Sequence, residues 1–154
     1  MMTKREKFPL GTGEPDIGLC AHANLRKAMR VVSQAYDATL KPSGLRTTQF
    51  TLLAVLAGRG AVAMTKLADI LVMDRTTLTR NLKPLTAKGW LDIGRDGDDR
   101  VRLVSITKAG RKAVTGATPL WRDAQNRVAR EFGEARLSGM IDDLTALVEA
   151  VRAR

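Results

Sequence analysis

The chain has 154 residues, a formal net charge of +10 and 44 % hydrophobic residues, which is the size and composition of one ordinary globular domain. The single cysteine excludes an internal disulfide and favours a reducing, cytoplasmic location. One cysteine and one histidine also exclude a structural zinc site of the usual kind. No apolar run approaches the roughly 18 residues of a membrane span, and no apolar stretch follows the basic N-terminus, so we expect no membrane segment and no signal peptide.

The positive charge is concentrated in two parts of the chain. Residues 1–46 carry eight basic and four acidic side chains, and residues 75–112 carry ten and four, whereas the segments 47–74 and 113–154 are neutral. A concentrated positive field attracts a polyanion, so nucleic acid is the favoured partner. A basic surface that serves solubility alone is the alternative. An anionic membrane would require a basic amphipathic helix.

The N-terminal half of the chain is expected to be helical. Residues 1–17 contain two prolines and two glycines and are predicted to form a loose arm. A helix then runs from Leu19 to the stop at Pro42 and Gly44, and a second runs from Thr47 to Ala57, ended by Gly58 and Gly60. The first helix has a continuous apolar face, formed by Leu25, Met29, Val32, Tyr36 and Leu40.

The C-terminal half is expected to contain two strands with helices on either side of them. A short helix is expected over Thr65–Leu71 and another from Asp74 to about Lys88. Strands are expected over Trp90–Ile93 and Val101–Ile106, joined by a polar loop. Thr107 should cap a helix of about 20 residues that bends at Pro119. The last helix, Glu134–Ala153, carries an apolar stripe formed by Leu137, Ile141, Leu144, Val148 and Val151.

Residues 64–83 have the pattern of a helix-turn-helix. Ala68 allows the two helices to cross closely, and Asp74 is a good N-cap for the second helix. Core contacts are expected from Leu67, Leu71, Met73 and Leu78. Two residues depart from the usual pattern: Val72 stands where the turn often has glycine, and Pro84 should bend the second helix.

The fold class that follows is mainly α with a small β-hairpin, a winged helix-turn-helix. We expect a DNA-binding lobe over residues 47–107, flanked by dimerisation helices over 18–46 and 108–154, because the apolar stripes of the outer helices need a partner. A two-fold dimer would place its recognition helices about 34 Å apart on a pseudo-palindrome. The residues expected to contact bases follow Asp74, and they are Arg75, Thr76, Thr77, Thr79 and Arg80.

The sequence resembles the multiple antibiotic resistance regulator (MarR) family. The segment Asp74–Arg80 is similar to the start of that family's recognition helix, and Asp98-Asp99-Arg100 followed by Leu103–Gly110 is similar to its wing. The resemblance implies a homodimeric bacterial transcription regulator, usually a repressor, that leaves its operator when a small molecule or an oxidant acts on it.

The wing and two lysines complete the expected DNA contacts. Arg100 should enter the minor groove, and the resemblance suggests that Asp98 holds it through a charge-assisted bond. Asp98 can equally be a turn-forming residue. The side chains expected to contact phosphates are Lys66, Lys83, Arg95 and Arg102.

Two readings remain open for the effector. The resemblance suggests a pocket for an aromatic or anionic ligand, lined by His22, Arg26, Met29, Phe50, Met64 and Trp121. The alternative is an oxidant sensor at Cys20, in one branch of the family, but Thr47 stands where that branch has a partner tyrosine. A lone cysteine is more commonly a small buried hydrophobic residue.

Other classes of protein fit less well. The chain has no enzyme motif and no cofactor motif, and the carboxylates at the wing tip do not have the spacing of a calcium loop, so we expect no enzyme, cofactor or metal. A winged helix that binds protein is a rival, although such modules often have a neutral or acidic recognition helix. An architectural protein that binds DNA without reading its sequence is a second rival.

Overall fold

The computed structural model describes residues 16–95, 97 and 101–153. The chain divides into two bodies, Met1–Ala35 and Tyr36–Arg154, and each is treated by itself. The predicted arm over residues 1–17 lies almost wholly outside the described residues. The first body contains a short 3-10 helix, η1 (Ile17–Leu19), and most of α1 (Ala21–Leu40), whose last turn belongs to the second body.

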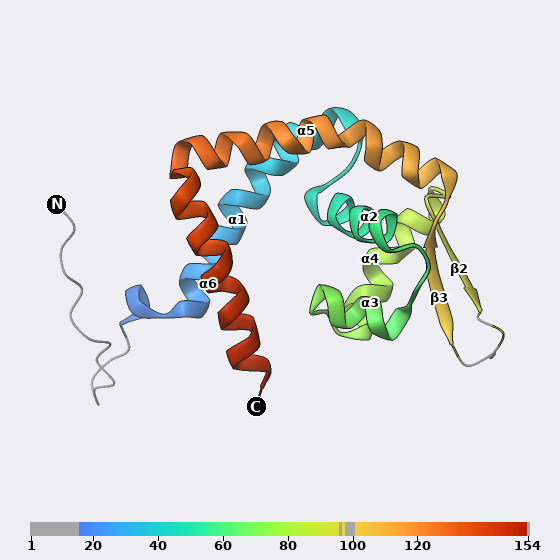
Figure 1. Ribbon diagram of the computed structural model, residues 1–154, viewed down its shortest axis with the longest axis horizontal. Helices are drawn as coiled ribbons and strands as arrows, with labels where there is room; N and C mark the ends of the chain where they lie inside the picture. Colours follow the sequence, from blue (N-terminus) through green and yellow to red (C-terminus); the bar gives the residue numbers. More distant parts are fainter. Residues whose placement is uncertain (1–15, 96, 98–100, 154) are drawn as a thin grey trace. The chain divides into compact units, whose positions relative to one another are not determined.

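The second body contains the remaining elements (Figure 1). A 3-10 turn, η2 (Lys41–Ser43), follows α1 and ends at Gly44, whose φ of 71° favours glycine. The other helices are α2 (Thr47–Arg59), α3 (Met64–Leu71), α4 (Arg75–Ala87), α5 (Lys108–Phe132) and α6 (Glu134–Arg152). In Figure 1, α5 passes over α2, and α6 leaves its end at a sharp angle after Gly133. The prediction of a mainly helical chain with a small β element is confirmed.

The sheet has one more strand than the sequence predicted. It consists of β1 (Val62–Ala63), β2 (Leu91–Arg95) and β3 (Arg102–Ile106) in the antiparallel order β1-β3-β2. The two-residue β1 pairs with β3 through Val62 opposite Val104. Trp90, predicted to begin a strand, precedes β2 instead, and β2 extends further than predicted, to Arg95.

Two predictions of helix length were also inaccurate. Helix α2 continues through Gly58, which therefore does not end it; Gly60, at φ 78°, is the residue that follows its last turn. Helix α5 spans 25 residues and contains Pro119 in its interior. It ends only at Gly133, whose φ of 97° suits glycine.

The core of the second body joins the helices to the sheet. Its fully buried members come from α1, α2, α3, α4 and β3, and they include Leu40, Leu53, Leu67, Leu82 and Val104. Burial of a leucine contributes about 1.5–3 kcal/mol. This core fixes α4 against α2 and the sheet, so the opposite face of α4 is held toward solvent.

Candidate nucleic-acid interface

Asp74 sets the start of α4. Its carboxylate accepts the backbone N–H of Thr77 at 2.8 Å and the Thr77 hydroxyl at 2.5 Å. The side-chain bond from Thr77, followed by the backbone bonds, holds the pKa of Asp74 below its ordinary value. The predicted N-cap is confirmed. It fixes the orientation of the first turn of α4, from which the candidate base contacts project.

The two faces of α4 differ in chemistry. Leu78, Leu82 and Leu85 are buried in the core. The exposed side chains along the helix are basic or carry hydroxyls, and they are Arg75, Thr76, Thr79, Arg80 and Lys83. No acidic residue lies between Asp74 and Asp92 in the sequence. The exposed face of α4 can therefore donate hydrogen bonds to a polyanion without local repulsion.

The threonines of α4 are not equivalent. Thr77 is half-buried and its hydroxyl donates to Asp74, so its side chain serves the cap in this structure. Thr79 is exposed, and its hydroxyl donates to the carbonyl of Arg75 at 2.8 Å. That bond occupies the hydroxyl hydrogen of Thr79 but leaves its methyl group and acceptor lone pairs for a ligand.

The turn between α3 and α4 is unusual at Val72. The N–H of Met73 donates to Ala68 and that of Val72 to Asp69, which is a Schellman arrangement. Val72 adopts φ 52° and ψ 46°, and among the described residues it alone has a positive φ without being glycine. The left-handed conformation is costly for a β-branched residue. The glycine expected at such a turn is therefore replaced here by a strained valine.

The end of the β2–β3 hairpin next to its loop carries a pair of arginines. Arg95 on β2 and Arg102 on β3 are directly opposite each other in the antiparallel register, and both are exposed. Asp98 and Arg100 lie outside the described residues. The loop end of the hairpin thus adds two cations to those of α4.

Comparison with known proteins agrees with this geometry. The model of the MarR family matches residues 43–100. The transcriptional regulator MosR of M. tuberculosis, solved in complex with DNA, is 39 % identical to this chain, with 86 % of this chain and 98 % of MosR covered and a TM-score of 0.77. The chain belongs to the MarR family. Members of this family are transcription regulators rather than enzymes, which confirms the expectation that the chain is not an enzyme.

Two curated members of the MarR family match over shorter stretches. The uncharacterised regulator YwoH of Bacillus subtilis is 27 % identical over 88 residues, which are 57 % of this chain and 64 % of YwoH. The multiple antibiotic resistance protein MarR of Salmonella typhimurium is 33 % identical over 72 residues, or 46 % of this chain and 50 % of MarR. The matches thus span between half and two thirds of the curated relatives' length.

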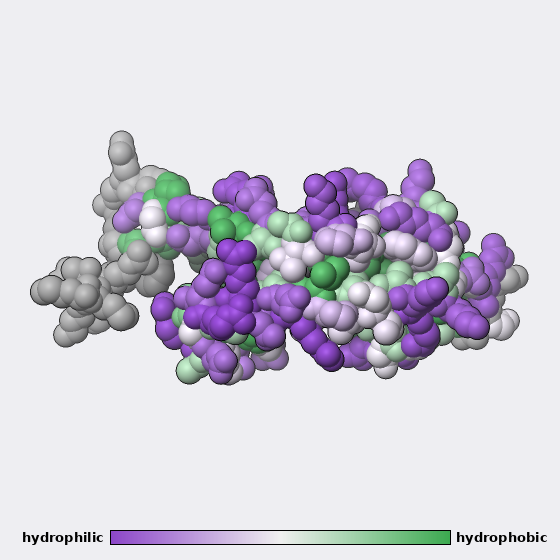
Figure 2. Space-filling view, turned by 90° about the horizontal axis from the view of Figure 1, so that it is seen from above, coloured by the Kyte–Doolittle hydropathy of each residue, from purple (hydrophilic) through white to green (hydrophobic). Residues whose placement is uncertain are grey.

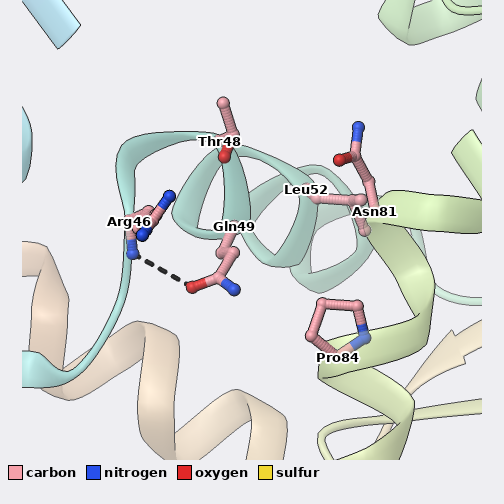
Figure 3. A pocket seen from close by; sticks show the side chains of 6 residues that line it. All are labelled: Arg46, Thr48, Gln49, Leu52, Asn81 and Pro84. Carbon is pink, nitrogen blue, oxygen red and sulfur yellow. Dashed lines mark hydrogen bonds between the residues drawn. The ribbon is translucent and has the colours of Figure 1, made fainter. Parts of the chain in front are cut away.

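This MarR-family chain has a further polar pocket beside α4 that sequence reasoning missed. It has a volume of about 180 Å³ and lies between the start of α2 and the middle of α4, lined by Arg46, Thr48, Gln49, Leu52, Asn81 and Pro84 (Figure 3). The Gln49 side chain accepts the N–H of Arg46 at 3.1 Å, which closes the first turn of α2. In the sequence, the glutamine three residues after Arg46 could have indicated this closed first turn of α2, but not the pocket. Lys66 and Lys83, the predicted phosphate contacts, are both exposed.

The six candidate effector residues of this MarR-family chain occupy different environments. Phe50 and Met64 are buried in the core, and Phe50 stacks on Trp121 with ring centroids 5.7 Å apart. His22, Arg26 and Met29 are exposed on α1, in the first body. The polar pocket beside α4 is lined by other residues. The predicted pocket therefore remains a prediction.

Cys20 ends η1 and is half-buried. Its N–H donates to the carbonyl of Ile17, and its own carbonyl accepts from the Asn24 side chain at 2.9 Å. Within the described part of the chain no cluster of three or more His, Cys, Asp or Glu side chains could hold a metal ion. No helix among those residues is both long and apolar enough to span a membrane.

Proposed function

We propose that this MarR-family chain is a sequence-specific, DNA-binding transcription regulator. The observation that carries the proposal is the exposed Arg and Thr face of α4, together with the two opposed arginines next to the loop of the hairpin. Arg75 and Arg80 can read guanine edges in the major groove, while Thr76 and Thr79 contact thymine methyl groups or phosphates. The DNA complex of MosR, at 39 % identity, supports the same partner for this chain.

The proposed phosphate contacts surround this reading face. Lys66, Lys83, Arg95 and Arg102 are exposed, and Arg46 of the polar pocket adds a cation beside α4. Such contacts supply salt-dependent affinity and fix the register of the protein on the duplex without reading its sequence. Arg100 and Asp98 are proposed for the minor groove, as the family resemblance suggests.

We propose further that the regulator is a homodimer. The apolar side chains of α6 remain 36–66 % exposed within one chain, from Met140 through Val151. A continuous exposed apolar stripe on a helix indicates an interaction surface. A second copy is the occupant that the two-fold symmetry of such regulators favours, and it would present two recognition helices to a pseudo-palindrome. A repressor role and release by a small molecule complete the proposal.

The test is selection of bound duplexes from a random DNA pool at about 150 mM salt, where nonspecific binding is weak. We expect a palindrome with half-sites about ten base pairs apart. Absence of any enriched motif would contradict the proposal.

Two variants distinguish base contacts, which depend on the DNA sequence, from phosphate contacts, which do not. Arg80→Ala should cost about 1–3 kcal/mol of operator binding and relax the selected motif, whereas Lys83→Ala should weaken binding to every duplex and reduce the salt dependence. An equal loss for Arg80→Ala on operator and random DNA would refute its role in reading bases.

A further inference from the structure

The last residue of α6 contacts the end of α3, the first helix of the helix-turn-helix. The Nη1 atom of Arg152 donates to the backbone carbonyl of Asp69 at 3.3 Å, and its Nη2 atom lies 3.8 Å from the Asp69 carboxylate. The two residues are 83 positions apart in the sequence. Half of the Arg152 side chain is exposed, so the contact joins the two helices at the surface rather than in the core.

The Asp69 carbonyl is also one of the acceptors that close the turn between α3 and α4. It accepts the backbone N–H of Val72 at 3.2 Å, while the N–H of Met73 donates to Ala68 at 2.9 Å. These bonds hold Val72 in its left-handed conformation, which is costly for a valine. Arg152 therefore donates to one of the two carbonyls on which this strained turn depends.

The end of α3 has no cation of its own. The partial negative charge at a helix C-terminus favours basic side chains there. The last turn of α3, which the structure describes in full, contains no basic residue, and Asp69 places an acid in it. Arg152 supplies a positive charge both to the carbonyl end of α3 and to the Asp69 carboxylate. The contact thus offsets an unfavourable charge at the turn, which an isolated surface ion pair does not.

The turn connects directly to the recognition helix. Only Val72, Met73 and Asp74 separate α3 from α4, and Asp74 caps α4. The sulfur of Met73 accepts from the Asn81 side chain at 3.5 Å, so the turn is also joined to the middle of α4. A change in the turn therefore alters the first half of α4, from which the candidate base contacts project.

We propose that Arg152 is a positioning residue for DNA binding. It acts through Asp69 and the turn at Val72, and it holds the recognition helix in the conformation that binds DNA. The inference rests on the proposed function, which it deepens by assigning a part in DNA binding to a residue outside the DNA-binding lobe. Arg152 also lines, with Leu144 and Val148, the exposed groove of α6 on which a second copy is proposed to bind. Dimer assembly and the recognition helix are then linked through one side chain.

The test compares Arg152→Gln with a matched control on α5. Figure 2 looks onto α5, where hydrophilic residues border a strip of hydrophobic and near-neutral ones. Arg127 and Glu131 form an exposed ion pair on this helix at 2.8 Å, and Arg127→Gln removes the same charge without changing the turn. We expect Arg152→Gln to weaken binding of the selected duplex about threefold to tenfold, and Arg127→Gln to bind like the parent. Arg152→Lys should restore part of the affinity, because lysine also donates to carbonyls at a helix end.

The salt dependence and a second substitution distinguish positioning from a direct DNA contact. Loss of a phosphate contact would reduce the slope of log K against log salt by about one, whereas loss of a positioning residue leaves this slope unchanged. The effect of Arg152→Gln should also be smaller when Asp69 is already changed to Asn, because the two residues act through one contact. A changed slope, or an equal effect in both backgrounds, overturns the positioning role.

Hydrogen exchange separates this inference from the proposed function. The Val72 amide hydrogen is bonded to the Asp69 carbonyl, and its exchange should become faster in Arg152→Gln but not in Arg127→Gln. An unchanged exchange rate, or unchanged operator affinity in Arg152→Gln, overturns the inference and leaves the proposed function intact. Faster exchange in a protein that selects no DNA motif would support the link between α6 and the turn while refuting the proposed function.

Discussion

Helices α4 and α6 have the same kind of apolar spacing but end in opposite environments. Leu78, Leu82 and Leu85 of α4 are at most 1 % exposed, whereas Ile141, Leu144 and Val148 of α6 are 36–48 % exposed. An apolar stripe predicts which face of a helix will be covered, but not by what. The second body itself supplies the cover for α4, whereas the cover proposed for α6 is a second copy of the chain.

Truncating a buried leucine of α4 should change the stability of the protein more than the other substitutions considered below. Leu78 lies on the core-facing side of α4 and is fully buried. Leu78→Ala should lower the free energy of unfolding by about 2–5 kcal/mol, because a cavity is left in a closely packed core. Denaturant unfolding measures the change. A loss below about 1 kcal/mol would show that the lobe can collapse around the missing side chain.

A charge placed on the exposed apolar stripe of α6 should change the association of two chains rather than the folding of one. Leu144→Asp places a charge in the centre of the α6 stripe, and we expect the dimer to dissociate to monomers at micromolar concentration, because a buried unpaired charge is costly. Sedimentation equilibrium gives the change in association constant. Ala146→Asp adds the same charge on the opposite face of α6 and should leave the dimer intact. Equal behaviour of the two variants would contradict a dimer built on this stripe.

Val72 is a strained position within the otherwise well-packed lobe. Val72→Gly should stabilise the protein by about 0.5–1 kcal/mol, since glycine adopts a positive φ at no steric cost while losing more entropy on folding. A thermal melt detects the change as a rise of a few degrees. A lower melting temperature would mean that the exposed valine makes favourable contacts that outweigh its backbone strain.

The contribution of the Asp74 cap to the stability of the protein should be small and should depend on pH. The pKa of Asp74 is lowered in the folded state, so its contribution is present above the pKa of the unfolded state and is lost as the pH falls through the folded value. Stability should therefore fall below about pH 4 by a small increment that Asp74→Asn lacks, because asparagine caps without titrating. Unfolding of both proteins between about pH 2 and 7 measures this. An equal loss of stability at low pH in Asp74→Asn would show that other carboxyl groups cause the loss.

Local sequence signals predicted most of the fold. Asp74 and Thr107 were identified as caps from their side-chain chemistry, and both accept the expected backbone N–H groups. Strand β1 was missed because two residues carry no periodicity, and Val62 becomes part of a strand only by pairing with Val104. The length of α5 was underestimated; no glycine lies between Gly116 and Gly133, and the helix continues to Phe132.

The candidate site was predictable only where one helix carries it. The exposed positions of α4 follow from the cap and the helical period. The bond from the Thr77 hydroxyl to Asp74 depends on a side-chain rotamer, and the pocket of Arg46, Gln49 and Asn81 depends on the packing of α2 against α4. Contacts between elements distant in the chain leave no local pattern.

The pairing of β1 with β3 has a consequence for the order in which the protein folds. It joins Val62 to Val104 and so closes a loop that contains α3, α4 and β2. Closing a loop of some 40 residues costs about 3 kcal/mol of chain entropy, so we expect the pair to form after the enclosed helices have packed. The recognition helix and the wing are then one cooperative unit, and their amide hydrogens should exchange with solvent through a common opening event. A mutation that loosens either one therefore exposes both to unfolding at the same rate.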